Sequence, residues 1–289
     1  MADKDPALAF IGFGEAGAAF ASGIGIAAIA YDCANKAEAC RSHGVAFATS
    51  NAAAVQNAGL ILSVVTADQA LAAARETARG IVRDALYCDC NSVAPDTKRA
   101  ARDAIEAAGG RYVDVAVMAP VHPAGRGVPL LVSGAHAEAG AAALQAAGFA
   151  KVRVVPGEVG RASSIKMIRS VMVKGLEALT AECVLAADRA GVLGEVLDSL
   201  DASPPPPDWH SRADYNLERM MAHGLRRAAE MEEVVKTLDA LGTGSAMTRG
   251  TVVRQRAIGA LTIAAPATLN QKLAALARSE AAPKRRNFA

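Results

Sequence analysis

The sequence has few aromatic residues, little net charge and no long hydrophobic run. Only 4% of its 289 residues are aromatic, and 31 Lys and Arg nearly balance 29 Asp and Glu. The shortage of aromatic residues argues against a surface for stacking nucleic-acid bases. The small net charge argues against the basic stripe that nucleic acid requires. No uninterrupted apolar run reaches the 18 residues of a transmembrane helix. We therefore expect neither a nucleic-acid nor a membrane partner.

Cysteine is also scarce, and its number is odd. Cys88 and Cys90 form one C-x-C pair, and no second pair or histidine cluster completes a zinc site. The N-terminal segment lacks the pattern of a signal peptide. These absences predict a reduced, cytoplasmic protein with small buried thiols and no bound metal.

Hydrophobic residues are abundant, at 52% of the chain, which suffices for a buried core and excludes disorder. In the first half, short apolar runs alternate with Ala-rich stretches typical of helices. This order predicts an α/β domain with a doubly wound parallel sheet, because strand–helix–strand units form right-handed crossovers. The predicted strands are residues 8–13, 26–31, 45–48, 60–66, 85–89, 112–116, 130–133 and 152–155, and the early helices are 15–22, 34–43, 68–79 and 96–108.

After Pro156 the pattern becomes entirely helical, so we expect domains at residues 1–160 and 161–289. An apolar stripe predicts a helix of about 25–30 residues, capped by Ser163 or Ser164 and ended by Gly191. The stripe comprises Ile165, Ile168, Met172, Leu176, Leu179, Cys183 and Ala186. Since short neighbours cannot cover it, we expect a homodimer through this helix. Further predictions are a polyproline segment at 204–207, helices at 209–241 (interrupted near 223–224) and 247–259, and a solvated tail from residue 283.

A glycine-rich loop follows the first predicted strand. Gly12, Gly14 and Gly17 have the G-x-G-x-x-G spacing of a dinucleotide-binding turn. Asp32 ends the second strand 20 residues after Gly12 and can accept hydrogen bonds from a ribose 2′-hydroxyl. This favours NAD, although NADP stays open because Lys36 is near. The alternatives are a glycine turn without a nucleotide and a helix N-cap at Asp32. The residues expected to contact the cofactor are Gly12, Phe13, Gly14, Glu15, Ala16, Asp32, Val65, Thr66 and Asn91.

Together with three further motifs, this loop resembles the β-hydroxyacid dehydrogenase superfamily, which includes 3-hydroxyisobutyrate and 6-phosphogluconate dehydrogenases and, more distantly, imine reductases. The motifs are Asp89-Cys-Asn-Ser-Val-Ala-Pro95, Asp114-Val-Ala-Val-Met-Ala-Pro120 and the loop from Gly157 to Ser170. The resemblance covers nearly the whole chain. It implies an N-terminal Rossmann domain, a helical C-terminal domain and dimerisation through a long helix.

The resemblance also implies site residues. Lys166 matches the catalytic lysine, with Arg169 and Ser170 at the positions of two asparagines on the same helix face. Asn91 and Ser92 replace a Ser-Thr pair that binds a substrate oxygen. Arg169 could favour the neutral amine that a general base needs or hold an anionic substrate group. Without the resemblance, Lys166 reads as a solvated lysine, and residues 91–95 as a turn before a helix.

The second motif departs from the family's Ser-Gly-Gly. Met118, Ala119 and Pro120 stand in its place, and proline has no N–H donor for a substrate carboxylate. This favours a larger or more apolar substrate. His122 and Arg126 follow in a glycine-rich loop, where either could meet substrate or lie on the surface. His223, Arg226, Arg227 and Glu230 can line one helix face, either at the site or as solvated ion pairs.

The sequence thus predicts a small-molecule oxidoreductase that moves hydride between a nicotinamide and the hydroxyl or carbonyl carbon of a 3-hydroxy-acid-like substrate. Lys166 is the predicted general acid/base. The predicted substrate contacts are Asn91, Ser92, Met118, Ala119, His122, Arg169, Ser170 and His223. Two alternatives stay open, an imine or ketone reductase and a non-catalytic dinucleotide sensor.

Overall fold

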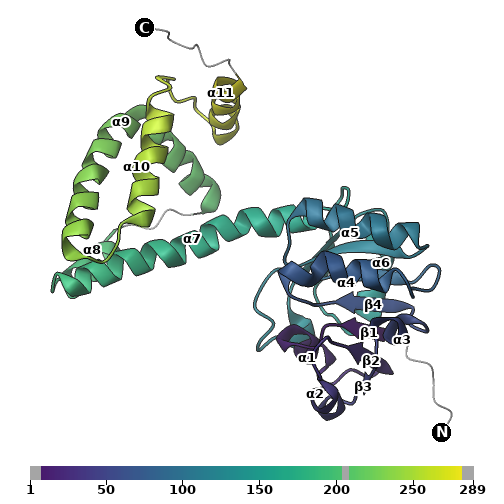
Figure 1. Ribbon diagram of the computed structural model, residues 1–289. Helices are drawn as coiled ribbons and strands as arrows, with labels where there is room; N and C mark the ends of the chain where they lie inside the picture. Colours follow the sequence, from purple (N-terminus) through teal and green to yellow (C-terminus); the bar gives the residue numbers. More distant parts are fainter. Residues whose placement is uncertain (1–7, 204–207, 282–289) are drawn as a thin grey trace. The chain divides into compact units, whose positions relative to one another are not determined.

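A computed structural model describes residues 8–203 and 208–281 (Figure 1). The chain forms two units, Met1–Met172 and Val173–Ala289, and each is described by itself. The predicted polyproline segment and the tail from residue 283 lie outside the described residues. Within the described residues, no helix is both long and apolar enough to cross a membrane.

The first unit contains an eight-stranded sheet with the order β3-β2-β1-β4-β5-β6-β7-β8. The strands are β1 (Leu8–Ile11), β2 (Ala28–Tyr31), β3 (Ala46–Phe47), β4 (Leu60–Ser63), β5 (Leu86–Asp89), β6 (Arg111–Val117), β7 (Leu130–Ser133) and β8 (Val152–Val154). The predicted α/β fold class is confirmed. Beside β1 the strand order reverses, with β2 on one side and β4 on the other. Ligands of such sheets bind at the carboxyl ends of the strands at this point.

One strand pair differs from the fully parallel prediction. β6 and β7 are antiparallel, with Val117 opposite Leu130. Their connection holds only a short turn, η2 (Gly125–Gly127), where a parallel crossover would need a helix.

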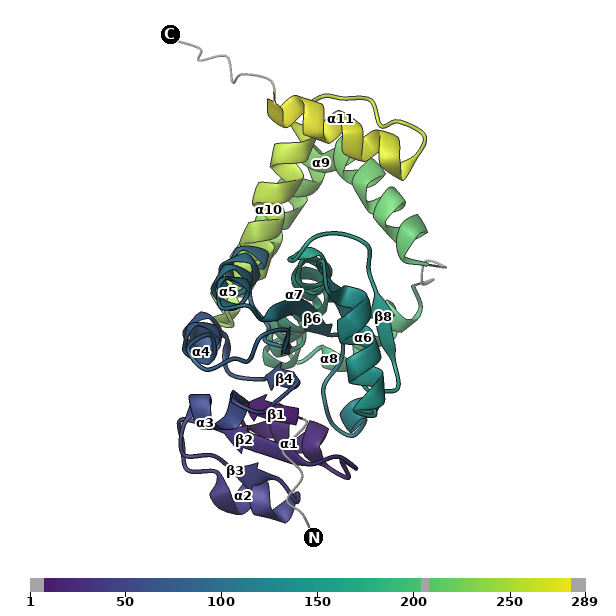
Figure 2. The same ribbon diagram turned by 90° about the vertical axis from the view of Figure 1, so that its right-hand side faces the viewer.

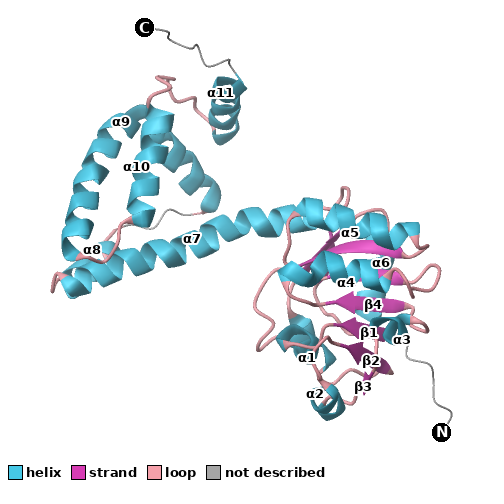
Figure 3. Cartoon of the chain, in the orientation of Figure 1, coloured by secondary structure: helices cyan, strands magenta, loops and turns pink. Residues whose placement is uncertain are grey.

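Helices cover both faces of the sheet, as Figures 2 and 3 show. The core cluster around Leu8, Phe10 and Leu62 joins one face to α1 (Glu15–Ala21), α2 (Ala37–Ser42) and α6 (Ala137–Ala146). The cluster around Ile11 and Ile61 joins the opposite face to α3 (Asn51–Val55), α4 (Ala70–Thr77) and α5 (Pro95–Ala107). A short turn, η1 (Ala67–Gln69), precedes α4. Strand side chains point alternately to the two faces, so continuous apolar runs are buried on both.

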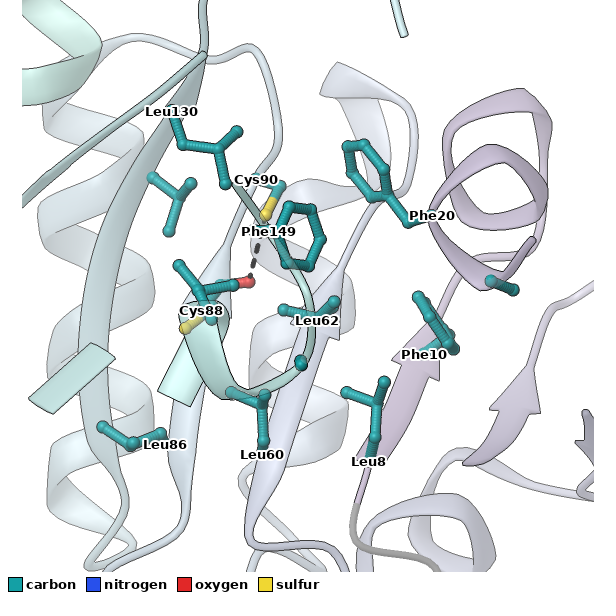
Figure 4. Close-up of a cluster of buried hydrophobic side chains, with 14 of the residues drawn as sticks. Leu8, Phe10, Phe20, Leu60, Leu62, Leu86, Cys88, Cys90, Leu130 and Phe149 are labelled. Atoms are coloured by element: carbon teal, nitrogen blue, oxygen red, sulfur yellow. Dashed lines mark hydrogen bonds between the residues drawn. The ribbon is translucent and has the colours of Figure 1, made fainter. Parts of the chain in front are cut away.

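Three of the cysteines, Cys40, Cys88 and Cys90, lie in the first cluster, and Figure 4 shows the last two. Cys88 and Cys90 are buried, and burial raises the pKa of the Cys90 thiol to about 12 and that of Cys88 well above its usual value. Cys40 is buried as well, so the prediction of buried thiols holds for these three residues. It is wrong for Cys33, which is exposed and is the second residue after the end of β2.

The second unit is helical. A helix of 29 residues, α7 (Arg161–Arg189), begins in the first unit and continues into the second. It is followed by α8 (Leu193–Asp201), α9 (Trp209–Leu241), α10 (Ala246–Gly259) and α11 (Leu269–Ala281). Gly191 and Gly242 follow α7 and α9 with positive φ, as the sequence predicts for helix ends.

The interruption predicted at residues 223–224 is wrong, because α9 is continuous. A Cβ on Gly224 would lie 2.8 Å from the Cα of Gly259 and 2.4 Å from the Gln255 carbonyl oxygen. Gly224 therefore permits the close crossing of α9 and α10.

The predicted serine cap of α7 is also wrong. The helix begins at Arg161, and Oδ2 of Asp114 at the middle of β6 accepts the backbone N–H groups of Gly160 and Ser163 at 3.0 and 3.1 Å. Ser163 donates its own hydroxyl to the same carboxylate. A carboxylate from the sheet thus takes the place of a local cap.

Candidate active site

The glycine loop joins β1 to α1 at the point where the strand order reverses. Gly12 has a φ of +92°, and a Cβ there would lie 2.7 Å from the carbonyl oxygen of Val64, so this position requires glycine. Gly14 is the N-cap of α1, and because glycine has no side chain, the first N–H groups of the helix have no side-chain cap. A Cβ at Gly14 would meet no atom within 4 Å. The start of α1 is therefore open to a ligand, in the arrangement that binds phosphate groups.

Asp32 follows β2 and faces this loop. Its Oδ2 accepts the N–H of Phe13 at 2.7 Å, and its Oδ1 accepts the N–H of Ala34 at 2.9 Å. The carboxylate lines a cavity of about 220 Å³ with Gly12, Gly14 and Glu76. Asp32 does not cap α2, whose N-cap is Lys36. It holds the glycine loop and remains at the wall of a pocket next to it.

Asn91 ties together two strand ends beside the loop. Its Oδ1 accepts the N–H of Val65 at 2.7 Å, and its Nδ2 donates to Oγ of Ser63 at 2.9 Å. Only 4% of Asn91 is exposed. Val65 and Thr66 line the pocket near Asp32 and also a second, larger cleft. The amide of Asn91 thus fixes the segment that separates these two hollows.

The second cleft, of about 500 Å³, contains Lys166 and Ser92. Nζ of half-buried Lys166 in α7 donates to Oγ of Ser92 at 2.5 Å, and Ser92 follows the end of β5. The cleft is also lined by residues Glu15 and Ala16 at the start of α1. The geometry therefore joins an amine, a hydroxyl and the open end of the glycine loop in one hollow of the first unit.

Part of the lining of this cleft is apolar. It is formed by Val117, Ala119, Pro120 and Val121. The N–H of Met118 donates to the carbonyl oxygen of Pro129. The Met118 side chain packs against the small cluster around Leu131 and Ala162 and is not part of the cleft lining.

Several predicted residues lie elsewhere. His122 lines a separate hollow of about 380 Å³ with Arg126, whose guanidinium donates to the carbonyl oxygens of Phe20 and Gly23 at the end of α1. Cations are favourable at that helix end, which gives Arg126 a structural role.

Arg169 and Ser170 follow Lys166 on α7 and do not line the cleft. Arg169 is exposed, and the hydroxyl of Ser170 donates to the backbone carbonyl of Lys166 at 2.9 Å. His223 is half-buried in α9 of the second unit, where Arg226 is exposed and Glu230 belongs to the same helix.

A buried charge cluster behind the cleft was not predicted. Lys98 in α5 is 0% exposed, and its Nζ donates to Oδ1 of Asp89 at 3.0 Å and lies 3.5 Å from Oδ1 of Asp114. The two aspartates open the motifs singled out in the sequence. The sequence did not indicate that Lys98 is buried, because a lysine on an amphipathic helix is normally solvated.

Residues 7–152 match the family described as the NAD binding domain of 6-phosphogluconate dehydrogenase, and residues 187–258 match a domain of unknown function, DUF1932. A conserved hypothetical protein from Sinorhizobium meliloti 1021 is 36% identical over 96% of this chain and 97% of its own, with a TM-score of 0.59.

Two further solved structures are similar to this chain. One is a conserved protein of unknown function described as structurally similar to 3-hydroxyacid dehydrogenases. It is 30% identical over 90% of this chain and 99% of its own, with a TM-score of 0.57. An imine reductase from Myxococcus stipitatus in complex with NADP+ shares the fold at 20% identity over 88% of this chain and 95% of its own, with a TM-score of 0.72. The chain belongs to the family that carries the NAD-binding domain of 6-phosphogluconate dehydrogenase.

Proposed function

We propose that this protein is an NAD(P)-dependent oxidoreductase in which Lys166 is the general acid/base for a substrate with a hydroxyl or carbonyl carbon, of the 3-hydroxy-acid type. The observation that carries the proposal is the Lys166–Ser92 pair, 2.5 Å apart, in a cleft that the glycine loop also lines. Proton transfer to a carbonyl oxygen requires an acid within hydrogen-bond reach of that oxygen, and an amine beside a hydroxyl can hold the oxygen at such a distance.

The residues of the first unit fit a dinucleotide. The space at Gly14 and the uncapped start of α1 suit a pyrophosphate, and Asp32 suits a ribose 2′-hydroxyl. When bound, the nicotinamide supplies or accepts the hydride. We propose NAD as the preferred cofactor, because Asp32 and Glu76 both line the smaller pocket and would repel a 2′-phosphate.

Lys166 and Ser92 would hold the substrate oxygen between them. In oxidation, the neutral amine takes the hydroxyl proton as hydride leaves the carbon. In reduction, the ammonium returns that proton to the carbonyl oxygen. Asn91 acts by positioning its neighbours, since its amide holds the backbone N–H of Val65 and the hydroxyl of Ser63.

A second candidate is an imine or ketone reductase, and the apolar wall favours it. Val117, Ala119, Pro120 and Val121 offer no side-chain donor to a carboxylate, and Pro120 has no N–H. A neutral carbonyl or a cyclic imine would lose less hydration against this wall than a carboxylate.

The test replaces Lys166 by Met and exposed Lys151 by Met as the matched control. Each protein is given NADH or NADPH with hydroxy acids, ketones and cyclic imines. We expect Lys166→Met to lose roughly 100-fold in turnover, the usual scale for removing an acid–base group, with the cofactor affinity retained. Equal turnover in both variants would refute the role of Lys166. Tight NADH binding by the native protein without turnover on any substrate would support the sensor alternative instead.

We also propose a homodimer through α7. Ile168, Met172, Leu176 and Leu179, all in its predicted apolar stripe, are 72%, 46%, 43% and 44% exposed. Apolar side chains at this spacing on a helix favour burial against a partner. Light scattering on a size-exclusion column should give twice the 29.5 kDa chain mass, and Leu176→Glu should shift it towards the monomer. A monomeric native protein at micromolar concentration would refute the dimer.

A further inference from the structure

The buried cluster behind the cleft links the two elements that carry the proposed reacting pair. Lys98 extends from α5 to the end of β5 and the middle of β6, where its Nζ donates to the backbone carbonyl of Asp89 at 2.5 Å and to that of Val115 at 3.4 Å. The same Nζ forms ion pairs with Asp89 and Asp114. One ammonium group therefore contacts both strands.

Asp89 controls the segment that bears Ser92. It is the last residue of β5 and is 0% exposed. Its Oδ1 accepts the N–H of Asn91 at 3.0 Å, and its Oδ2 accepts the hydroxyl of Tyr112 at 2.6 Å. The backbone that leads to Ser92 is thereby fixed by this carboxylate.

Asp114 controls the helix that bears Lys166. Its Oδ2 accepts hydrogen bonds from Ser133, Gly160 and Ser163, and Ser163 lies one turn before Lys166 on α7. Its Oδ1 has no hydrogen-bond partner among the described residues, and Nζ of Lys98 lies 3.5 Å from it. The position of the first turn of α7 therefore depends on this carboxylate and on its buried cation.

We infer that Lys98 is a positioning residue, which holds Asp89 and Asp114 together so that Ser92 and Lys166 stay within hydrogen-bond distance. The inference rests on the proposed function, because only that function makes the pair a reacting pair. Lys98 itself is fully buried and is not among the residues that line the cleft.

Electrostatics explains why a lysine is needed at this point. Two carboxylates buried side by side repel each other, and both are costly to keep away from water. A single buried cation offsets this cost and holds the two carboxylates on β5 and β6 together. Without the cation, the two carboxylates would separate or one would take up a proton, and either change would move the segments that carry Ser92 and Lys166.

The test compares Lys98→Met, which keeps the length of the side chain and removes its charge, with Ile105→Val. Ile105 is a buried apolar residue of the same helix, two turns after Lys98, and its side chain has no charge to lose. Turnover, KM and NADH affinity are measured for each folded variant. We expect Lys98→Met to lose at least tenfold in kcat with NADH affinity within twofold of the native value, and Ile105→Val to keep its kcat.

A crystal structure of Lys98→Met gives the second readout. We expect the distance between Lys166 Nζ and Ser92 Oγ to exceed hydrogen-bond range. An unchanged distance, or a kcat equal to that of Ile105→Val, would overturn the inference. If Lys98→Met does not fold, Lys98→Gln replaces it, with the same expectations and the same refuting results. If the native protein turns over no substrate, the proposed function fails by itself, and the distance in the variant alone decides the role of Lys98.

Discussion

Replacing Gly14 by Ala separates ligand binding from folding at the glycine loop. The residue has a φ of −81°, which alanine adopts without strain, and the new Cβ would meet no protein atom within 4 Å. The methyl group would instead occupy the open space at the start of α1. The substitution should therefore affect a bound dinucleotide and leave the protein intact.

The magnitudes can be worked out for both effects. Alanine restricts the unfolded chain, which stabilises by about 0.4–1 kcal/mol. The loss of glycine as N-cap destabilises by about 0.5–1 kcal/mol, since alanine is a poor cap. The two nearly cancel. A methyl group against a pyrophosphate should cost at least about 1.4 kcal/mol of binding, or a tenfold rise in Kd.

Gly17→Ala is the contrasting variant. Its Cβ would lie 2.8 Å from the carbonyl oxygen of Gly12 in a buried contact. Overpacking there costs about 1–3 kcal/mol, and the better helix propensity of alanine offsets about 1 kcal/mol. Urea unfolding and calorimetric titration with NADH check both variants. If Gly14→Ala bound NADH as tightly as the native protein, the assignment of this space to the cofactor would be refuted.

Three further predictions concern the rest of the chain. Gly224→Ala should destabilise the second unit by about 1–3 kcal/mol through overpacking, whereas Gly250→Ala, with no atom within 4 Å of its Cβ, should stabilise it; equal urea midpoints would refute the close crossing. Burial raises the pKa of Glu182, but hydrogen bonds from Thr248 and the start of α10 outweigh it and lower that pKa below its usual value. Glu182→Gln should therefore lose about 1 kcal/mol at neutral pH, and the difference from the native protein should vanish as pH falls below the usual glutamate range; a constant difference would refute this. Exposed Cys33, which lines the smaller pocket, should react with a maleimide before the buried thiols and be protected by NADH; equal rates with and without NADH would contradict its place in the pocket.

The glycine loop and the sheet could be predicted because their signals are local. Gly12, Gly14 and Gly17 lie within six consecutive residues, and the buried strands are continuous apolar runs. The strand predicted at 130–133 coincides with β7, and most others differ by one to three residues at an end. Short helices such as α3 and α8 were not predicted, because they offer too few turns for a periodic signal.

The remaining features depend on contacts between distant residues. The cap of α7 comes from Asp114, 46 residues before Gly160, so no pattern near Ser163 could reveal it. Lys98 is buried only because two carboxylates from β5 and β6 meet it. Gly224 resembles a helix break along the sequence and permits a helix crossing in the structure. The role of Lys166 stays a prediction, supported by its contact with Ser92.

The attachment of α7 to β6 has a consequence for protein engineering. A chimera that joins the sheet of this chain to the helices of a relative at residue 160 would bring a foreign first turn onto Asp114. The N–H groups that bind Asp114, at positions 160 and 163, would then depend on the sequence of the relative. The position of the amine of residue 166, one turn later, would change with them. A splice after Met172 keeps the anchor and Lys166 on one parent, so exchange of the helical segment is best made there.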